Sequence, residues 1–181
     1  HLLTGEGRNR RVCGKGCVLF PPRSVTGEIV SLYGRKIEGG GHYYLTGRKG
    51  LYPRYLSPKA ERVILTESVI DAASILQMKK ISEAYQVLAL YGTNGLTAEH
   101  TKHLKSLTQL KEVVLMLDGD EAGRAASQKH QAALKLLLPQ VTIRVVNLPK
   151  DMDINELWAN HLNEELFLEL LKLPEPKTAK Q

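Results

Sequence analysis

Within residues 61–148, the apolar positions follow two patterns that alternate along the chain. Continuous apolar runs occur at residues 62–66, 85–92, 112–117 and 141–148, with sequences "RVILT", "YQVLALYG", "EVVLML" and "VTIRVVNL". The segments between these runs are predicted to be helices, at residues 67–80, 97–108 and 121–138. In the first of them, the apolar residues recur at helical spacing. Continuous apolar runs are typical of strands that are covered on both faces. The alternation therefore predicts βαβ units and an α/β fold with a parallel sheet flanked by helices.

Residues 17–60 show no helical spacing and are rich in Gly, Pro, Tyr and Arg. Short strands are predicted at residues 17–20, 27–35 and 41–47, separated by turn signals such as Pro21-Pro22 and Gly39-Gly40-Gly41. This pattern predicts a small antiparallel β-rich subdomain. The predicted organisation is a basic arm (1–16), the β-rich subdomain (17–60), the α/β domain (61–160), a C-terminal helix (161–173) and a disordered tail (174–181).

Charge is distributed unevenly along the 181 residues, whose formal net charge is +6. Residues 1–62 contain twelve Lys or Arg and four Asp or Glu, a net charge of +8, whereas residues 63–181 carry a net charge of −2. A basic segment beside an acidic domain favours a polyanion such as nucleic acid as partner, although solvated basic loops would have the same composition.

Other features of the composition exclude some classes of protein. No apolar run is long enough to span a bilayer and no signal peptide is visible, so a cytoplasmic protein without membrane contact is expected. The two cysteines, Cys13 and Cys17, are too few for a four-thiolate zinc site.

Acidic residues follow three of the four strands predicted in the α/β domain. Glu67 follows the first strand, Asp118 and Asp120 follow the third, and Asp153 follows the fourth. A glycine-rich turn, Gly92–Gly95, follows the second strand. Ligands of open parallel sheets bind at the carboxyl ends of the strands, where the ends of neighbouring strands lie close together. The four acids are therefore expected to share one edge of the sheet.

Clustered carboxylates repel one another unless a cation neutralises them. Oxygen ligands without nearby Cys or His favour Mg²⁺, or Mn²⁺, over Zn²⁺. In extended backbone, Asp118 and Asp120 would point to the same side and could face one ion. A metal held in this way suits phosphoryl or nucleotidyl transfer, because it stabilises charge on the attacking and leaving oxygens.

Several neighbouring residues have two interpretations each. Asp71 is either a further ligand or an ion-pair partner for a basic side chain, and Asn155 is either an amide ligand or a helix N-cap. Thr93 and Asn94 either hold phosphate through backbone amides or only form a turn. Arg124 either contacts phosphate or forms a salt bridge on the helix surface.

Four segments of the α/β domain together resemble a Toprim domain, in order and at suitable spacings. They are "VILTESVIDAASI", "YGTNGLT", "VVLMLDGDEAGRAA" and "LPKDMDINEL", within residues 61–160. This Rossmann-like module binds metal in bacterial primases, type IA and type II topoisomerases, OLD-family nucleases and recombination mediators. The resemblance implies that Glu67 is the acidic residue at the strand end and that Asp118 and Asp120 are the paired aspartates.

The preceding segment resembles the one before the Toprim domain in bacterial replicative primases. The matching motifs are Leu19-Phe20-Pro21, Thr26-Gly27, Tyr33-Gly34-Arg35, Tyr43-Tyr44-Leu45-Thr46 and Lys49-Gly50-Leu51-Tyr52. Topoisomerases and recombination mediators lack this run, so the resemblance is to the catalytic core of a primase.

Three substitutions distinguish the chain from the replicative pattern. Tyr43 and Thr46 occupy the family's Lys and Asn, and Asn155 lies where those enzymes usually have Asp. The resemblance therefore indicates a divergent primase from a phage, plasmid or conjugative element.

The resemblance implies a DNA primase core that joins ribonucleoside triphosphates into short RNA primers on single-stranded DNA, with Mg²⁺ or Mn²⁺ as cofactor. It implies catalytic roles for Glu67, Asp118 and Asp120, and metal ligation by these three and Asp153. The residues expected to contact nucleic acid or nucleotide are Arg35, Lys49, Thr93, Asn94 and Arg124. A replicative helicase would be a partner through a domain outside these residues, at the nucleoid or replication fork. Two other functions stay open: a metal-dependent Toprim nuclease and a non-catalytic nucleic-acid-binding adaptor.

Overall fold

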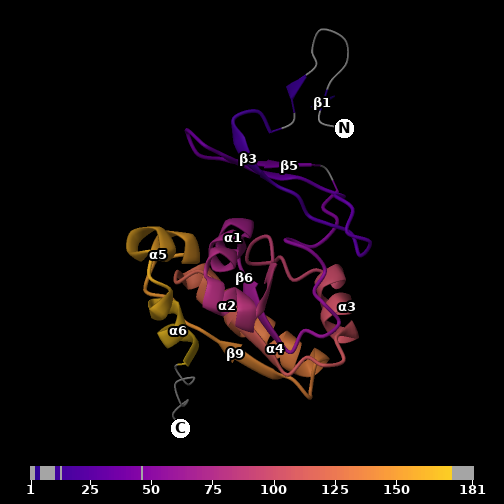
Figure 1. Ribbon diagram of the computed structural model, residues 1–181, viewed down its shortest axis with the longest axis vertical. Coiled ribbons are helices and arrows are strands. Elements are labelled where there is room, and N and C mark those ends of the chain that lie inside the picture. The colour runs from indigo at the N-terminus through magenta and orange to yellow at the C-terminus, as the bar shows by residue number, and fades with distance from the viewer. Residues whose placement is uncertain (1–2, 5–10, 13, 46, 173–181) are drawn as a thin grey trace. The chain divides into compact units, whose positions relative to one another are not determined.

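The computed structural model describes residues 3–4, 11–12, 14–45 and 47–172, which form two compact units (Figure 1). The N-terminal unit is His1–Tyr55 and the C-terminal unit is Leu56–Gln181. Most of the predicted arm, including Cys13, and all of the predicted disordered tail (174–181) lie outside the described residues. Within the arm, strands β1 (Leu3–Thr4) and β2 (Arg11–Val12) pair antiparallel.

The N-terminal unit contains a three-stranded antiparallel sheet, as the sequence predicts. Its strands are β3 (Cys17–Phe20), β4 (Tyr33–Lys36) and β5 (His42–Tyr44), in the order β3-β4-β5. The prediction of a strand over residues 27–35 is wrong at its start, because β4 begins only at Tyr33. The preceding chain is folded into a turn in which Ser24 and Glu28 are joined by a backbone hydrogen bond of 2.8 Å.

The C-terminal unit contains the predicted parallel sheet, which is flanked by helices. Its strands are β6 (Arg62–Thr66), β7 (Gln86–Ala89), β8 (Glu112–Met116) and β9 (Thr142–Val145). All pairs are parallel and the order is β7-β6-β8-β9. The central strands β6 and β8 are almost fully buried beyond their first residues, which is why they read as continuous apolar runs.

Six helices accompany this sheet in the described part of the chain. They are α1 (Val69–Gln77), α2 (Lys79–Ala84), α3 (Ala98–Ser106), α4 (Glu121–Leu137), α5 (Ile154–His161) and α6 (Glu164–Lys172). Helix α1 packs against β6 and β7, whereas α4 packs against β8 and β9. Helix α3 begins after the predicted N-cap, Thr97, whose hydroxyl accepts from the backbone of His100. Among the described helices, none is both long and apolar enough to cross a membrane.

The prediction of a single helix over residues 67–80 is wrong, because the helix is interrupted at Met78. Met78 has an extended backbone with φ −83° and ψ 100°, and its side chain is 1% exposed. Burying this side chain in the core takes precedence over continuing the helix. Helix α2 therefore starts anew at Lys79, and sequence periodicity did not identify it.

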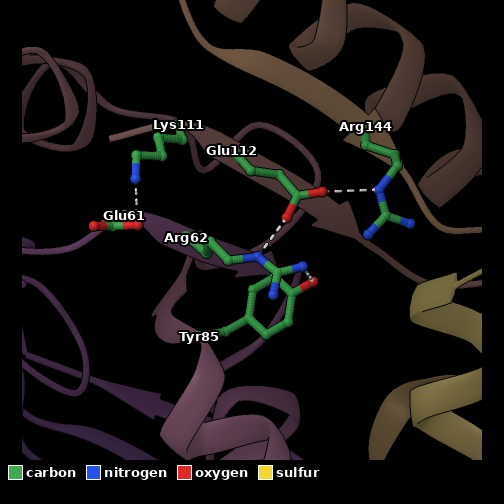
Figure 2. Close-up of polar contacts among 6 residues, drawn as sticks. All are labelled: Glu61, Arg62, Tyr85, Lys111, Glu112 and Arg144. Atoms are coloured by element: carbon green, nitrogen blue, oxygen red, sulfur yellow. Dashed lines mark hydrogen bonds and ion pairs between the residues drawn. The ribbon is translucent and has the colours of Figure 1, made fainter. Parts of the chain in front are cut away.

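A group of charged side chains joins three strands of the sheet (Figure 2). Arg62 and Glu112 are the first residues of β6 and β8, and Arg144 is the third residue of β9. Glu112 on β8 accepts hydrogen bonds from Arg62 on β6 at 2.8 Å and from Arg144 on β9 at 3.0 Å. Arg62 also donates to the Tyr85 hydroxyl and lies 4.0 Å from the centre of its ring. Burial acts to raise the pKa of Glu112, but the hydrogen bonds from the two arginines lower it overall. One carboxylate thus links side chains from the three strands.

Two leucine-to-alanine variants test the central position of β8. Leu115 is fully buried, whereas Leu136 on α4 is 87% exposed. We expect Leu115→Ala to lower the free energy of unfolding by about 2–5 kcal/mol, because it removes buried methyl groups and leaves a cavity. The matched control Leu136→Ala should change it by less than about 0.5 kcal/mol. Urea denaturation measures both values, and equal values would contradict the assigned core.

Candidate acidic site at the carboxyl ends of the strands

The order of the strands places a ligand site at the ends of β6 and β8. The chain runs from β6 to its neighbour β7 on one side, and from β8 to its neighbour β9 on the other. Connections that leave two adjacent strands in opposite directions mark the point where open α/β sheets bind ligands. Thr66 pairs with Met116, so Glu67 and Asp118 follow neighbouring positions of the two strands. Topology therefore brings these two predicted acids together.

Glu67 and Asp118 each bury one carboxylate oxygen that has no hydrogen-bond partner among the described residues, Glu67 Oε2 and Asp118 Oδ1. Burial raises the pKa of Asp118 to about 8, with further contributions from the negative charges of Asp71, Glu67, Asp153 and Asp120. Burial likewise raises the pKa of Glu67, although a hydrogen bond from the Asp118 backbone opposes the change. Five carboxylates therefore interact electrostatically at this edge of the sheet.

Asp120 and Asp153 have a structural role that was missed at the level of sequence, because each is the N-cap of a helix. Asp120 accepts from the Gly123 N–H at 2.6 Å at the start of α4, and Asp153 accepts from the Glu156 N–H at 2.6 Å at the start of α5. A helix N-terminus stabilises a negative charge there. An acid directly before a helical segment was the available signal.

Asp71 is a buried member of the cluster, and its interpretation as an ion-pair partner is wrong. The residue is 2% exposed. Its carboxylate accepts hydrogen bonds from the Ser68 hydroxyl at 2.6 Å and from the Asn155 N–H at 3.1 Å. Burial is the main cause that raises its pKa, and the charge of Asp153 adds to it. Asp71 thus links the first turn of α1 to the first turn of α5.

Asn155 lies inside α5, so its interpretation as a helix N-cap is also wrong. Asp153 caps the helix instead. The Asn155 side-chain amide donates to the Ser74 hydroxyl at 3.0 Å, while its backbone N–H donates to Asp71. Asn155 therefore fixes α5 against α1 beside the acidic cluster.

Two side chains of helix α4 form hydrogen bonds with the glycine-rich turn after β7. The Thr93 carbonyl oxygen lies 2.8 Å from His130 Nε2, and Asn94 Oδ1 accepts from Lys129 Nζ at 3.1 Å. Burial lowers the pKa of His130, which favours the neutral ring that donates one N–H. Sequence reasoning missed both His130 and Lys129, because nothing in the local pattern shows that α4 reaches this turn. Thr93 and Asn94 have turn-holding contacts, and their role toward phosphate stays a prediction.

Three basic residues predicted to contact substrate lie in different surroundings. The Arg124 guanidinium donates to the Gly119 carbonyl, and the salt bridge considered as one of its two interpretations is not formed with any described residue. In the N-terminal unit, Arg35 on β4 lies 2.6 Å from His42 Nε2, and Lys49 is exposed. The roles of these residues toward nucleic acid stay predictions.

Gly119 holds the two acidic loops of the C-terminal unit together. Its N–H donates to the Met152 carbonyl at 2.8 Å, and a Cβ atom at this position would lie 2.0 Å from the Pro149 carbonyl oxygen. A side chain at Gly119 would therefore push apart the segments that carry Asp118 and Asp153.

The chemistry of the acidic cluster fits a hard divalent cation. Glu67 Oε2 and Asp118 Oδ1 are buried acceptors without a protein donor, and a cation would neutralise the repulsion around them. Within the described residues, no three acidic, His or Cys side chains converge as a complete set of ligands. Mg²⁺ commonly binds through one or two carboxylates and keeps several waters, so it does not need such a set.

This combination of fold and site defines an α/β domain of the Rossmann-like class with an acidic site at its topological switch point. The model of the Toprim-like family matches residues 64–158, more than half of the chain. The chain therefore belongs to the Toprim-like family.

The similarity to known proteins extends beyond the family match. The chain is 32% identical over 162 residues to a DNA primase of Staphylococcus epidermidis, which covers 83% of the chain and 26% of that protein. A DNA primase of Myxococcus xanthus is 30% identical over 175 residues. The chain thus spans about a quarter of the length of these relatives.

Solved structures share the fold. A DNA primase domain from Pseudomonas aeruginosa has a TM-score of 0.70 at 23% identity, covering 94% of this chain and 55% of that one. The primase fragment of the bacteriophage T7 primase-helicase protein has a TM-score of 0.67 at 24% identity, covering 84% and 62%. These likenesses confirm the predicted fold class, a parallel α/β sheet preceded by a small β-rich subdomain.

The pKa of Asp118 predicts how stability depends on pH in the metal-free protein. Its pKa is about 8 in the folded state against an ordinary value of 3.8, so the folded state keeps a proton that the unfolded state loses. The stability due to this proton is complete below about pH 4 and is lost as the pH rises through about 8. Asp118→Asn stays neutral, so its advantage in unfolding free energy over the wild type should grow from pH 5 to pH 9.

Thermal or urea unfolding in EDTA measures this difference. Asp151→Asn is the matched control, because Asp151 is an exposed acid that does not contribute to the raised pKa of Asp118. An advantage of Asp118→Asn that is the same at both pH values would contradict the raised pKa.

Proposed function

We propose that the chain is the catalytic core of a DNA primase, which joins ribonucleotides into short RNA primers on single-stranded DNA. The observation that carries the proposal is the acidic cluster, in which Glu67 and Asp118 bury carboxylate oxygens that lack a protein partner. Metal-binding acidic sites catalyse several reactions. The similarity to DNA primases over more than four fifths of the chain favours primer synthesis among them.

The acids of the cluster would divide into metal ligands and a positioning acid. Asp118, Asp120 and Asp153 would hold Mg²⁺ or Mn²⁺, which when bound stabilises charge on the attacking and leaving oxygens. Glu67 would be a further ligand or would orient the attacking 3′-hydroxyl. The capping bonds of Asp120 and Asp153 fix their carboxylates, since each engages one oxygen and leaves the other for a ligand.

The basic residues would hold the polyanionic substrates. Arg35 and Lys49 would contact template phosphate or the incoming ribonucleoside triphosphate, and Arg124 would contact phosphate beside the acidic cluster. Thr93 and Asn94 would present turn backbone to the triphosphate. Binding through such charge contacts weakens as salt is added.

A replicative helicase is the further partner that we propose, contacted through a domain other than the two units described. The relatives include a DNA helicase/primase of Enterobacteria phage T3, which is 26% identical over 100 residues. Such a partner would place the protein at the replication fork.

Two aspartate-to-asparagine variants test the proposed chemistry. Asparagine is also a good N-cap, so Asp120→Asn removes the charge but retains the cap of α4. We expect Asp118→Asn and Asp120→Asn, each in the full-length protein, to reduce primer synthesis at least about 100-fold, because each removes charge that would hold the metal. Incorporation of labelled ribonucleotides on single-stranded DNA with Mg²⁺ or Mn²⁺ measures the loss.

Asp151→Asn is the matched control and should retain primer synthesis. Asp151 is exposed with φ 58°, a conformation that asparagine also tolerates. Primer synthesis that survives both cluster variants would contradict the catalytic assignment. Metal-dependent strand cleavage without incorporation, lost in the same variants, would show the nuclease instead. Binding of DNA without either reaction would show the adaptor.

A further inference from the structure

A hollow of about 360 Å³ opens on the N-terminal unit, outside the acidic site of the C-terminal unit. It lies beside the turn that follows Pro22 and the segment that follows Leu51. Its lining consists of Arg23, Ser24, Val25, Gly27, Arg54 and Tyr55. Two guanidinium groups thus line one hollow whose lining contains no carboxylate.

Neither arginine of this hollow pairs with an acid among the described residues. One Arg23 nitrogen donates to the Gly27 carbonyl at 2.7 Å, which orients the guanidinium and leaves its other donors unused. Arg54 is exposed and forms no ion pair within the same part of the chain. No acid of the described residues therefore neutralises the positive charge in the hollow.

The backbone that carries the two arginines is held rigidly. Arg23 and Leu51 exchange two backbone hydrogen bonds of 3.0 and 2.9 Å, and Leu51 is fully buried. A Cβ atom on Gly50 would lie 2.6 Å from the Arg23 carbonyl oxygen, so only glycine permits this close approach. Arg54 follows Leu51 by three residues. One pair of backbone hydrogen bonds thus holds Arg23 beside the segment that leads to Arg54.

The acid of the adjacent turn is occupied elsewhere. The Glu28 carboxylate accepts from the Thr26 hydroxyl at 3.0 Å, and the Glu28 N–H donates to the Ser24 hydroxyl at 3.2 Å. Glu28 does not line the hollow. Its contacts shape the turn, so they position Ser24 without neutralising the arginines.

We propose that this hollow binds a phosphate group through Arg23 and Arg54. The guanidinium group presents several N–H donors in a planar fork that matches the oxygens of phosphate, and two such groups suit a doubly charged anion. The source of the phosphate is either the backbone of a nucleic-acid strand or the triphosphate of a nucleotide. Only the identity of this source rests on the proposed function. The binding of phosphate itself does not, because it needs no catalysis.

Binding measured in EDTA with three probes separates these sources. The probes are inorganic pyrophosphate, ATP and a fluorescent twelve-residue oligothymidylate, each titrated into the intact chain. We expect Arg54→Gln to weaken binding of pyrophosphate about 5- to 10-fold, as loss of one charged contact predicts. If the strand is the source, oligothymidylate binding weakens as well, and its slope of log K against log salt falls by about 0.7. If the nucleotide is the source, ATP binding weakens and oligothymidylate binding does not.

Two further variants keep the test independent of folding and of total charge. Arg23→Lys keeps the charge but loses the planar fork, and it should weaken the same probes as Arg54→Gln. Lys15→Gln removes one positive charge from an exposed position of the N-terminal unit and should leave binding of pyrophosphate unchanged. Wild-type binding of every probe by Arg54→Gln, or an equal loss in Lys15→Gln, would overturn the proposal. The three probes are bound in EDTA, where neither metal nor catalysis contributes, so a failed catalytic proposal leaves this result interpretable.

Discussion

Repulsion among the carboxylates at the ends of β6 and β8 is the constraint on which the C-terminal unit depends. Thr66 pairs with Met116, so Glu67 and Asp118 lie beside each other however unfavourable their charges are. The buried strands beneath them fix this register, and Glu112 links β8 to β6 through Arg62 and to β9 through Arg144. The apolar core thus stabilises an arrangement that the acids alone would oppose.

N–H and O–H donors of the fold offset most of this repulsion, but two carboxylate oxygens lack such a donor among the described residues. Asp120 and Asp153 accept from helix N-termini, and Asp71 accepts from Ser68 and the backbone of α5. Asp118 Oδ1 and Glu67 Oε2 are buried and receive no hydrogen bond from the residues that the structure describes, although buried acceptors are nearly always satisfied in native proteins. A bound ion is one way in which native proteins satisfy such groups, which is why these two oxygens support the proposal of a metal.

Sequence patterns predicted the parts of this site that depend on strand ends. Continuous apolar runs located the four strands, and the rule for parallel sheets placed Glu67, Asp118 and Asp153 on one edge before any coordinates. The break at Met78 and the contact between His130 and Thr93 could not be predicted, because each depends on how distant elements pack. Arg62 and Glu112 are fifty residues apart, so their pairing follows from strand register and not from local sequence.

The unequal charge of the two parts of the chain acquires a physical meaning from their structures. In the N-terminal unit, Arg23 and Arg54 line a hollow without a carboxylate, whereas in the C-terminal unit five carboxylates interact at one sheet edge. A cluster of acids repels a polyanion until a cation binds, and a basic surface holds a polyanion but cannot stabilise charge that develops on a leaving oxygen. Nucleotidyl transfer on a nucleic-acid strand requires both properties in one protein. The division of charge between the two units therefore fits the proposed nucleotidyl transfer, which needs both a basic surface and a cluster of acids.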